Sequence, residues 1–599
     1  MPLLRRDRKT ARSSERSSRP TGEAGAVQPA RVNRRRLFGL LLLAVVPYLA
    51  ALGHPFAYDD YAQVVRNGLV RSLDPRPVFA IGSVTHGTVE WYRPLAIYSL
   101  ALNYATTELK PWSYRLVNLA LHAANTALVL LIGRVIGTAA GAAAALFAVH
   151  AVHSEAVIPA FGRADLLSTL FVLLAWRITL GSRSGPGTAA AAAVLLFAGL
   201  LSKENAFALF PVVVASDLAV RTPRAPFAER LRGLLRERWP LYAALAAAIL
   251  IYGCLRVWAK DALLGTDGVR YIENPLIEAG PAARAATGLW TMLRYVQLLV
   301  VPYPLSVDYS YNQIPVIDRW SDPRLLAVAV ATLGVVILFR GWRWSRGPVL
   351  ALAVFLLFLA PVSNVLIPIG TIMAERLLYL PSVGSCLLAG FGFAAVRART
   401  AGSARRVALV AFALLIAVHS ALVVARSRDW ASDLRLFAAA VAASPNSAKA
   451  HYNHGSALAD AGETRQAEAA LRSAVAIAPA YPEAQNLVGT LLLARGELAE
   501  AARAFQAALQ SSPDYPPALA NLGIVRRRQD RIDEARQLLE RAVRLDDSIV
   551  VAFVNLGLIA EKEGDVRKAV ALYRRAYALD PTLAVVRARA EELDPDSRK

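Results

Sequence analysis

Two adjacent carboxylates, Asp59 and Asp60, follow directly after the first long apolar segment, and aromatic residues flank them. Neighbouring side chains diverge by roughly 100° in a helix and 180° in a strand, so both cannot act on one atom. One of them could be a general base while the other orients a partner or a metal ion. A solvated loop is the simpler interpretation of an Asp-Asp pair, but the position of this pair beside an apolar segment argues for chemistry.

More charged residues stand beside apolar segments farther along the chain. A charge at the centre of a bilayer costs at least ~2.5 kcal/mol, so such residues pair, line a cavity or lie at the interface. We expect several of them on the same side of the membrane as Asp59, where they could converge. The full set of charged and polar residues beside apolar segments is His150, His153, Glu155, Arg163 and Asp165, then Lys203, Glu204 and Asn205, then Glu375 and Arg376, and finally Arg93.

Each of these groups also has a purely structural interpretation. His150 and His153 are spaced to share a helix face and could bind zinc, but no third clear ligand is present, so we expect buried, hydrogen-bonded histidines instead. For Lys203-Glu204 and Glu375-Arg376, an ion pair at a helix end and a phosphate site both remain open.

Long apolar runs indicate a polytopic membrane protein, because 55% of the 599 residues are hydrophobic. A spanning helix needs about 20 residues to cross roughly 30 Å of hydrocarbon. We expect the stretch from Thr287 to Val301 to be re-entrant or interfacial, which leaves about eleven spans. These lie near residues 37–52, 113–133, 138–153, 165–180, 188–202, 205–220, 240–258, 324–340, 348–367, 377–396 and 407–425.

The charge distribution predicts the orientation of the chain. The net charge of +22 is concentrated in a basic N-terminal tail and in Arg-rich loops near residues 221–238, 340–346 and 397–406. We expect these loops and the tail to be cytoplasmic, the tail to be disordered, and nucleic acid not to be a partner. An odd number of spans then places the C-terminal region outside the cytoplasm. The high Ala and Arg content suggests a bacterium and therefore the plasma (inner) membrane.

From about Ser444 the chain changes to a repeat of 34 residues. Gly455, Gly489, Gly523 and Gly557 are spaced by this period, as are several alanines and prolines. The pattern resembles the tetratricopeptide repeat, in which small residues let two antiparallel helices approach closely. We expect an α-solenoid with full repeats at residues 446–479, 480–513, 514–547 and 548–581, and a protein-binding role for it.

The motifs together resemble the transmembrane and tetratricopeptide-repeat-containing protein O-mannosyltransferases, which are membrane glycosyltransferases of the GT-C type. Ala151 departs from the proline that the family tends to have, and the repeat array is short, which leaves the acceptor open. The matching stretches are Asp59-Asp60 and residues 92–95, 114–118 with His122, 146–157, 162–167, 202–204 and 374–382, followed by the repeats.

This resemblance implies transfer of a sugar, mannose in the family, from a polyprenyl-phosphate carrier to a Ser or Thr hydroxyl of an extracytoplasmic protein. Asp59 is then the expected base and Asp60 its helper, while Arg376 and Lys203 are the expected partners of the donor phosphate. A divalent cation could assist, and the sequence does not decide this. The other expected substrate-binding residues are Arg163, Arg93, Glu375, Glu204, His150 and His153.

The expected organisation is all-α, with a basic tail at residues 1–36, a GT-C-like transmembrane domain at residues 37–425 and a repeat solenoid at residues 430–599. Two other functions remain open from the residues. The chain could be a non-catalytic membrane scaffold that presents the repeats for protein assembly, or a GT-C enzyme that acts on lipid-linked glycans.

Overall fold

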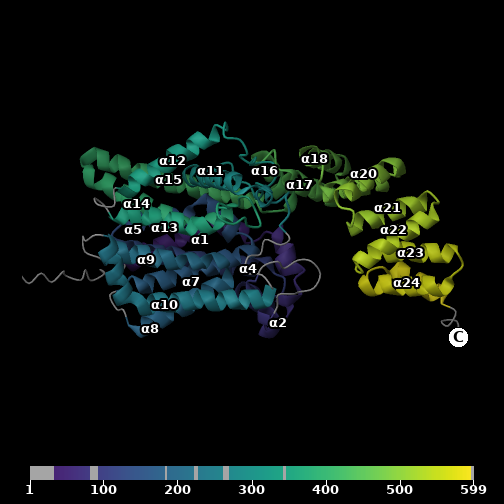
Figure 1. Cartoon of the computed structure of the whole chain (residues 1–599), viewed down its shortest axis with the longest axis horizontal. Coiled ribbons are helices and arrows are strands. Elements are labelled where there is room, and N and C mark those ends of the chain that lie inside the picture. The colour runs from purple at the N-terminus through teal and green to yellow at the C-terminus, as the bar shows by residue number, and fades with distance from the viewer. Residues whose placement is uncertain are drawn as a thin grey trace, which may run out of the picture.

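The computed structural model describes residues 33–80, 92–181, 185–221, 227–260, 269–340 and 346–594. The described residues form helices and connecting loops without a strand, so the all-α prediction is confirmed. Figure 1 shows a bundle of long helices beside a curved array of helix pairs that extends to the C-terminus. Most of the predicted disordered tail, as well as Arg224 and Arg343 of the Arg-rich loops, lies outside the described residues.

The bundle is built around one large apolar core that includes the fully buried Trp176 and Trp430. Helix α7 packs on α8 and α4, and α10 covers α8. The bundle helices are α1 (Arg34–Val45), α3 (Pro94–Thr107), α4 (Pro111–Ile136), α5 (Ala140–Val149), α7 (Arg163–Thr179), α8 (Pro186–Ser202), α9 (Leu209–Val220), α10 (Phe227–Lys260), α11 (Pro281–Val300), α12 (Arg324–Arg340), α13 (Arg346–Leu359), α14 (Ser382–Arg399) and α15 (Gly402–Asp429), joined by the short α2 (Pro75–Ala80) and α6 (Ser154–Val157).

Three helices in the described ranges are long and apolar enough to cross a membrane: α4, α10 and α15. Residues Ala140–Val149 and Ala151–Val157 form a pair bent by 51°, and they raise the number to four if they count as one span. These helices are those of a membrane protein, but the prediction of about eleven spans is not confirmed.

Prolines explain why many of the predicted spans are shorter than expected. Helix α1 gives way to a 3-10 turn that contains Pro47, and α13 ends where a 3-10 turn with Pro361 begins. Helix α14 starts only after Pro381. Because proline has no backbone N–H and clashes with the preceding turn, each apolar run is divided into shorter elements.

Two other expectations about the loops can be compared with the structure. The predicted Arg-rich loop near residues 221–238 is mostly helical, since α10 begins at Phe227, and the buried Arg238 pairs with Asp217 at 3.1 Å. The stretch predicted to be re-entrant or interfacial forms the 20-residue helix α11, whose buried residues lie on one face. It is not among the helices that meet the length and hydropathy of a span.

The C-terminal part of the chain is the predicted tetratricopeptide solenoid. It consists of four antiparallel helix pairs, each within one predicted repeat, preceded by α16 (Asp433–Ala443) and followed by α25 (Ala584–Leu593). The pairs are α17 (Ala448–Asp460) with α18 (Thr464–Ile477), α19 (Pro482–Ala494) with α20 (Leu498–Ser511), α21 (Pro516–Arg528) with α22 (Ile532–Leu545), and α23 (Val550–Lys562) with α24 (Val566–Leu579).

The periodic glycines lie where the two helices of each pair are closest. A Cβ at Gly489 would be 2.6 Å from the ring of Phe505, and one at Gly523 would be 2.8 Å from Leu539. Phe505 and Leu539 are fully buried, so they have no room to move away. The 34-residue period of glycine therefore records a close approach of the helices.

The packing at Gly489 generates a stability prediction. Gly489→Ala should lower the free energy of unfolding of the repeats by about 1–3 kcal/mol, because the added methyl group overpacks a full core. Thermal unfolding of the full-length protein in detergent measures this change as a lower Tm. Gly392→Ala is the matched control, since a Cβ there meets nothing within 4 Å, and an equal loss in both variants would contradict the packing explanation.

Candidate active site

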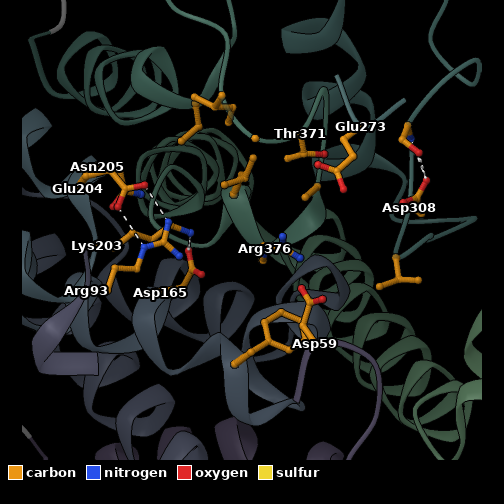
Figure 2. A pocket seen from close by; sticks show the side chains of 18 of the residues that line it. Asp59, Arg93, Asp165, Lys203, Glu204, Asn205, Glu273, Asp308, Thr371 and Arg376 are labelled. Atoms are coloured by element: carbon orange, nitrogen blue, oxygen red, sulfur yellow. Dashed lines mark hydrogen bonds and ion pairs between the residues drawn. The ribbon is translucent and has the colours of Figure 1, made fainter. Parts of the chain in front are cut away.

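A cavity of about 470 Å³ lies between the bundle and the first repeat. Five of the residues that the sequence analysis proposed for catalysis or substrate binding line it: Asp59, Arg93, Lys203, Glu204 and Arg376. They come from segments that are as much as 317 residues apart in the chain, and Figure 2 shows them around one space. The predicted convergence of the polar stretches therefore occurs for these five.

The cavity holds Asp59 through its neighbours in the chain. Tyr58 has a positive φ of 55°, and its N–H donates to Asp433 Oδ1 at 2.9 Å. A short helical turn begins at Asp59, and Asp60 N–H donates to Ala57 O at 3.1 Å. The main chain on both sides of Asp59 is thus fixed.

The Asp59 carboxylate lines the cavity and, in the described part of the chain, accepts no hydrogen bond and forms no ion pair. Burial raises the pKa of Asp59 above its usual value, and the positive charges of Arg376 and Lys449 oppose this effect. Figure 2 shows the carboxylate facing Arg376. Such a group can accept a proton without first breaking a contact within the protein.

Asp60 points away from the cavity and has a different environment. It is fully buried, and its Oδ1 accepts the main-chain N–H of Phe161 at 3.0 Å. Burial raises the pKa of Asp60 to about 7. The ring of Phe161 lies 5.3 Å from the Arg376 guanidinium, so Asp60 supports the segment that packs against this arginine. The expected divergence of the two adjacent carboxylates is what the structure shows.

Arg376 is held at the centre of the site by Glu155. Its Nη1 lies 2.5 Å from Glu155 Oε1, and its main-chain N–H donates to Glu155 Oε2 at 3.0 Å. Glu155 is fully buried, whereas the Arg376 side chain is 19% exposed. Because one carboxylate fixes both the main chain and the guanidinium, Arg376 presents its remaining N–H groups in a set direction.

The other cations selected from the sequence form ion pairs on the opposite side of the cavity. Lys203 Nζ lies 2.6 Å from Asp165 Oδ1, and Arg93 Nη2 lies 2.8 Å from Glu204 Oε1. Figure 2 shows the two pairs side by side. Lys203 and Glu204 therefore form ion pairs and also line the cavity, and the phosphate site predicted for them stays a prediction.

Arg163 does not line this cavity. Its Nε donates to Asn118 Oδ1 at 2.6 Å, and its Nη2 donates to Asn103 Oδ1 at 3.0 Å and to Tyr114 O at 2.9 Å. The side chain is only 1% exposed. Its contacts join α7 to α3 and α4.

Glu375 and the two histidines also lie outside the cavity lining. Glu375 Oε1 accepts the Ser306 N–H at 2.5 Å and the Tyr309 hydroxyl at 2.8 Å. His150 Nε2 lies 3.0 Å from Leu299 O, and His153 Nε2 lies 2.8 Å from Ser382 Oγ. The buried, hydrogen-bonded histidines expected from the sequence are therefore found.

No group of three or more His, Cys, Asp or Glu residues with an arrangement that could hold a metal ion occurs among the described residues. The charge in the cavity is instead compensated by side chains. Its lining has five cations, which are Arg93, Lys203, Arg270, Arg376 and Lys449, and five anions, which are Asp59, Asp165, Glu204, Glu273 and Asp308.

Sequence reasoning missed the wall formed by Arg270, Glu273, Asp308 and Lys449. Glu273 Oε1 lies 3.0 Å from both Lys449 Nζ and Arg270 Nη2, and Asp308 Oδ1 accepts from the Ser310 hydroxyl at 2.5 Å. These residues belong to two polar loops, one before and one after α11, and to a repeat helix, where charges are ordinary. Asp165 did carry a signal, because it lies in a polar stretch that the sequence had singled out.

Arg270, Glu273 and Asp308 lie within a region that matches a known protein family. Residues 269–336 match the family described as Protein O-mannosyl-transferase TMTC, DUF1736, and residues 420–482, 452–516, 492–550 and 552–585 match tetratricopeptide repeat families. Protein O-mannosyl-transferase F38B6.6 of Caenorhabditis elegans is 29% identical over an alignment of 450 residues. The alignment covers 72% of this chain and 61% of that protein. The chain is thus similar in sequence to proteins named as protein O-mannosyl-transferases.

Other TMTC proteins match over a similar share of the chain. Protein O-mannosyl-transferase TMTC3 of Homo sapiens is 27% identical over 461 residues, covering 72% of this chain and 50% of its own length. The chain thus spans between half and two thirds of the length of these TMTC relatives. The crystal structure of MamA is 23% identical, with a TM-score of 0.22, and covers 25% of this chain and 88% of MamA.

The placement of Arg163 predicts a loss of stability rather than a binding defect. Arg163→Leu leaves the oxygens of Asn118, Asn103 and Tyr114 buried without this donor, which should cost at least about 2–4 kcal/mol of unfolding free energy. Denaturation in detergent measures the loss, and donor KM in the folded fraction should remain within about twofold of wild type. A wild-type midpoint combined with a raised donor KM would contradict this assignment.

Proposed function

We propose that the protein transfers a sugar, mannose by analogy with the TMTC relatives, from a polyprenyl-phosphate carrier to a Ser or Thr hydroxyl of a protein. The observation that carries this proposal is that Asp59, a carboxylate without a direct partner among the described residues, and Arg376, a fixed cation, line the same cavity. The division into a catalytic part at residues 37–425 and a repeat solenoid at residues 430–599 is part of the same proposal.

Asp59 is the proposed general base. The acceptor oxygen attacks the anomeric carbon of the sugar and forms a new glycosidic bond, while the bond from that carbon to the phosphate oxygen breaks. The hydroxyl proton passes to Asp59, and the electron pair of the broken bond leaves with the polyprenyl phosphate. The burial of Asp59 suits this carboxylate to the task, because a carboxylate with a raised pKa is a stronger base at neutral pH.

Arg376 is the proposed partner of the phosphate that leaves. Charge develops on the phosphate oxygens as the bond breaks, and a guanidinium fixed in advance stabilises that charge without reorganising. Glu155 holds only part of the Arg376 hydrogen-bonding capacity, since Nη1 and the main-chain N–H are the donors that bond to it. Lys203 and Arg93 are farther partners in this proposal, because each already forms an ion pair with an acid.

The membrane arrangement is also proposed. Lys449 of the first repeat lines the cavity together with Asp59, so Asp59 and the repeats face the same compartment. The Arg-rich segments support a cytoplasmic N-terminus and an extracytoplasmic cavity in the plasma (inner) membrane, with several spans. The repeats would then recruit the acceptor protein beside the site of transfer.

Asp59→Asn tests the proposed base. The change keeps the size of the side chain and removes its basicity, so turnover should fall by about 10²–10⁴-fold while donor binding is retained. The measurement is transfer of labelled mannose from polyprenyl-phosphate-mannose to a Ser/Thr peptide by the purified protein in lipid. Without any acceptor peptide, wild-type protein should release sugar far more slowly.

The pH profile of wild-type protein provides a second measurement of the same base. A base must be ionised, so activity should fall as pH decreases through the pKa of Asp59, and the raised pKa places this fall above that of an exposed aspartate. Asp60→Asn should change the activity less than Asp59→Asn does, because Asp60 does not line the cavity. Full transfer by Asp59→Asn would reject the assignment of Asp59 as the base, whereas no transfer by the wild-type protein would favour a scaffold.

Arg376 is tested by comparing two substitutions. Arg376→Ala removes the charge, whereas Arg376→Lys keeps the charge and loses the planar fork. Apparent donor KM should therefore rise more in Arg376→Ala than in Arg376→Lys. Arg324→Ala is a matched control, since Arg324 pairs with Asp322 at 2.5 Å away from the cavity. Wild-type donor KM in both Arg376 variants would leave this residue with a structural role alone.

A further inference from the structure

The first tetratricopeptide repeat reaches into the cavity. Lys449, in the first turn of α17, lines the same space as Asp59 and is 21% exposed. Its Nζ lies 3.0 Å from Glu273 Oε1. In the helix pairs of the other three repeats, the described side chains do not line this cavity. One residue of the solenoid is therefore part of the wall around the proposed base.

Main-chain hydrogen bonds fix this repeat on the rim of the cavity. Asn312 N–H donates to Asn446 O at 2.8 Å, and Ala448 N–H donates to Tyr311 O at 2.7 Å. The hydroxyl of Ser447, which caps α17, donates to Asp308 Oδ1 at 2.6 Å. Three consecutive residues before Lys449 are thus bound to the loop that matches the TMTC family.

More contacts secure the array on both sides of this bridge. Arg270 pairs with Glu483 of the second repeat, and it also lies 3.0 Å from Glu273. On the other side, Asp433 of α16 accepts the N–H of Tyr58, the residue before Asp59. The array is docked at several points, and it does not hang from a free linker.

On the basis of the proposed function, we infer that Lys449 is a positioning residue for Asp59 and that the first repeat is a structural part of the active site. Lys449 acts through its charge, which favours the ionised form of the base. Arg376 supplies the same effect from the bundle, so the two cations flank the base from the two halves of the protein.

The charges around Asp59 come from every element that packs near it. Burial has the largest effect and raises the pKa of Asp59. The positive charges of Arg376 and Lys449 lower this pKa, and the negative charges of Glu273 and Asp308 raise it. Burial would lower the pKa of Lys449, but the nearby acids and tyrosines outweigh it, so Lys449 stays charged. The other titratable groups that face the pair are Tyr58, Asp60 and Tyr481.

The pH dependence of kcat/KM tests this inference, since it reports the titration of the free enzyme. In Lys449→Met, the acid limb should move to higher pH because Asp59 loses a neighbouring positive charge. Lys449→Arg should restore the wild-type limb. Lys562→Met is the matched control, because Lys562 of the fourth repeat pairs with Asp530 of the third repeat, away from the cavity.

Hydrogen exchange distinguishes a charge effect from loss of docking. The amides of Asn312 and Ala448 should remain as protected in Lys449→Met as in wild type. An unmoved acid limb overturns the inference, and so does a moved limb that appears only together with rapid exchange at these amides. If Asp59→Asn keeps full transfer, the proposed function fails first. If Asp59→Asn is inactive and the Lys449 variants behave as wild type, only the role of Lys449 fails.

Discussion

The ion pair between Glu155 and Arg376 is the contact on which the cavity depends. Glu155 is fully buried and binds both the guanidinium and the main chain of Arg376. A buried carboxylate without this partner would carry a large desolvation cost, so the two segments have to meet. This contact places Arg376 near Asp59. The Phe161 ring packs against the Arg376 guanidinium, and Asp60 accepts the main-chain N–H of Phe161.

The other charged side chains of the cavity are arranged by the same need for a partner of opposite charge. Ten charged side chains line about 470 Å³, five of each sign, and the cations are held by acids at the walls. Asp59 is the exception, because its carboxylate has no hydrogen-bond or ion-pair partner in the described part of the chain. The base that we propose is thus the one lining acid whose charge no direct contact among the described residues compensates.

Periodic patterns were the most reliable guides to the fold. The 34-residue spacing of glycine gave the helix pairs of the solenoid because each glycine marks a steric contact, such as Gly489 on Phe505. Apolar length was a weaker guide to the membrane part. Prolines such as Pro361 and Pro381 divide apolar runs into shorter elements, and a count of apolar residues does not register this.

In the site, costly charges in apolar surroundings pointed to Arg376 and Lys203. Lys449 and Glu273 lie in polar segments where another charge carries no signal.

The docking of Lys449 has a consequence for how the protein is made. Synthesis proceeds from the N-terminus, so the bundle residues around the cavity are complete before the first repeat emerges. The wall beside Asp59 stays open until the chain has been extended through residue 449 and the loop at residues 308–312 has captured it. A nascent chain therefore holds an unfinished cavity until its first repeat has been translated.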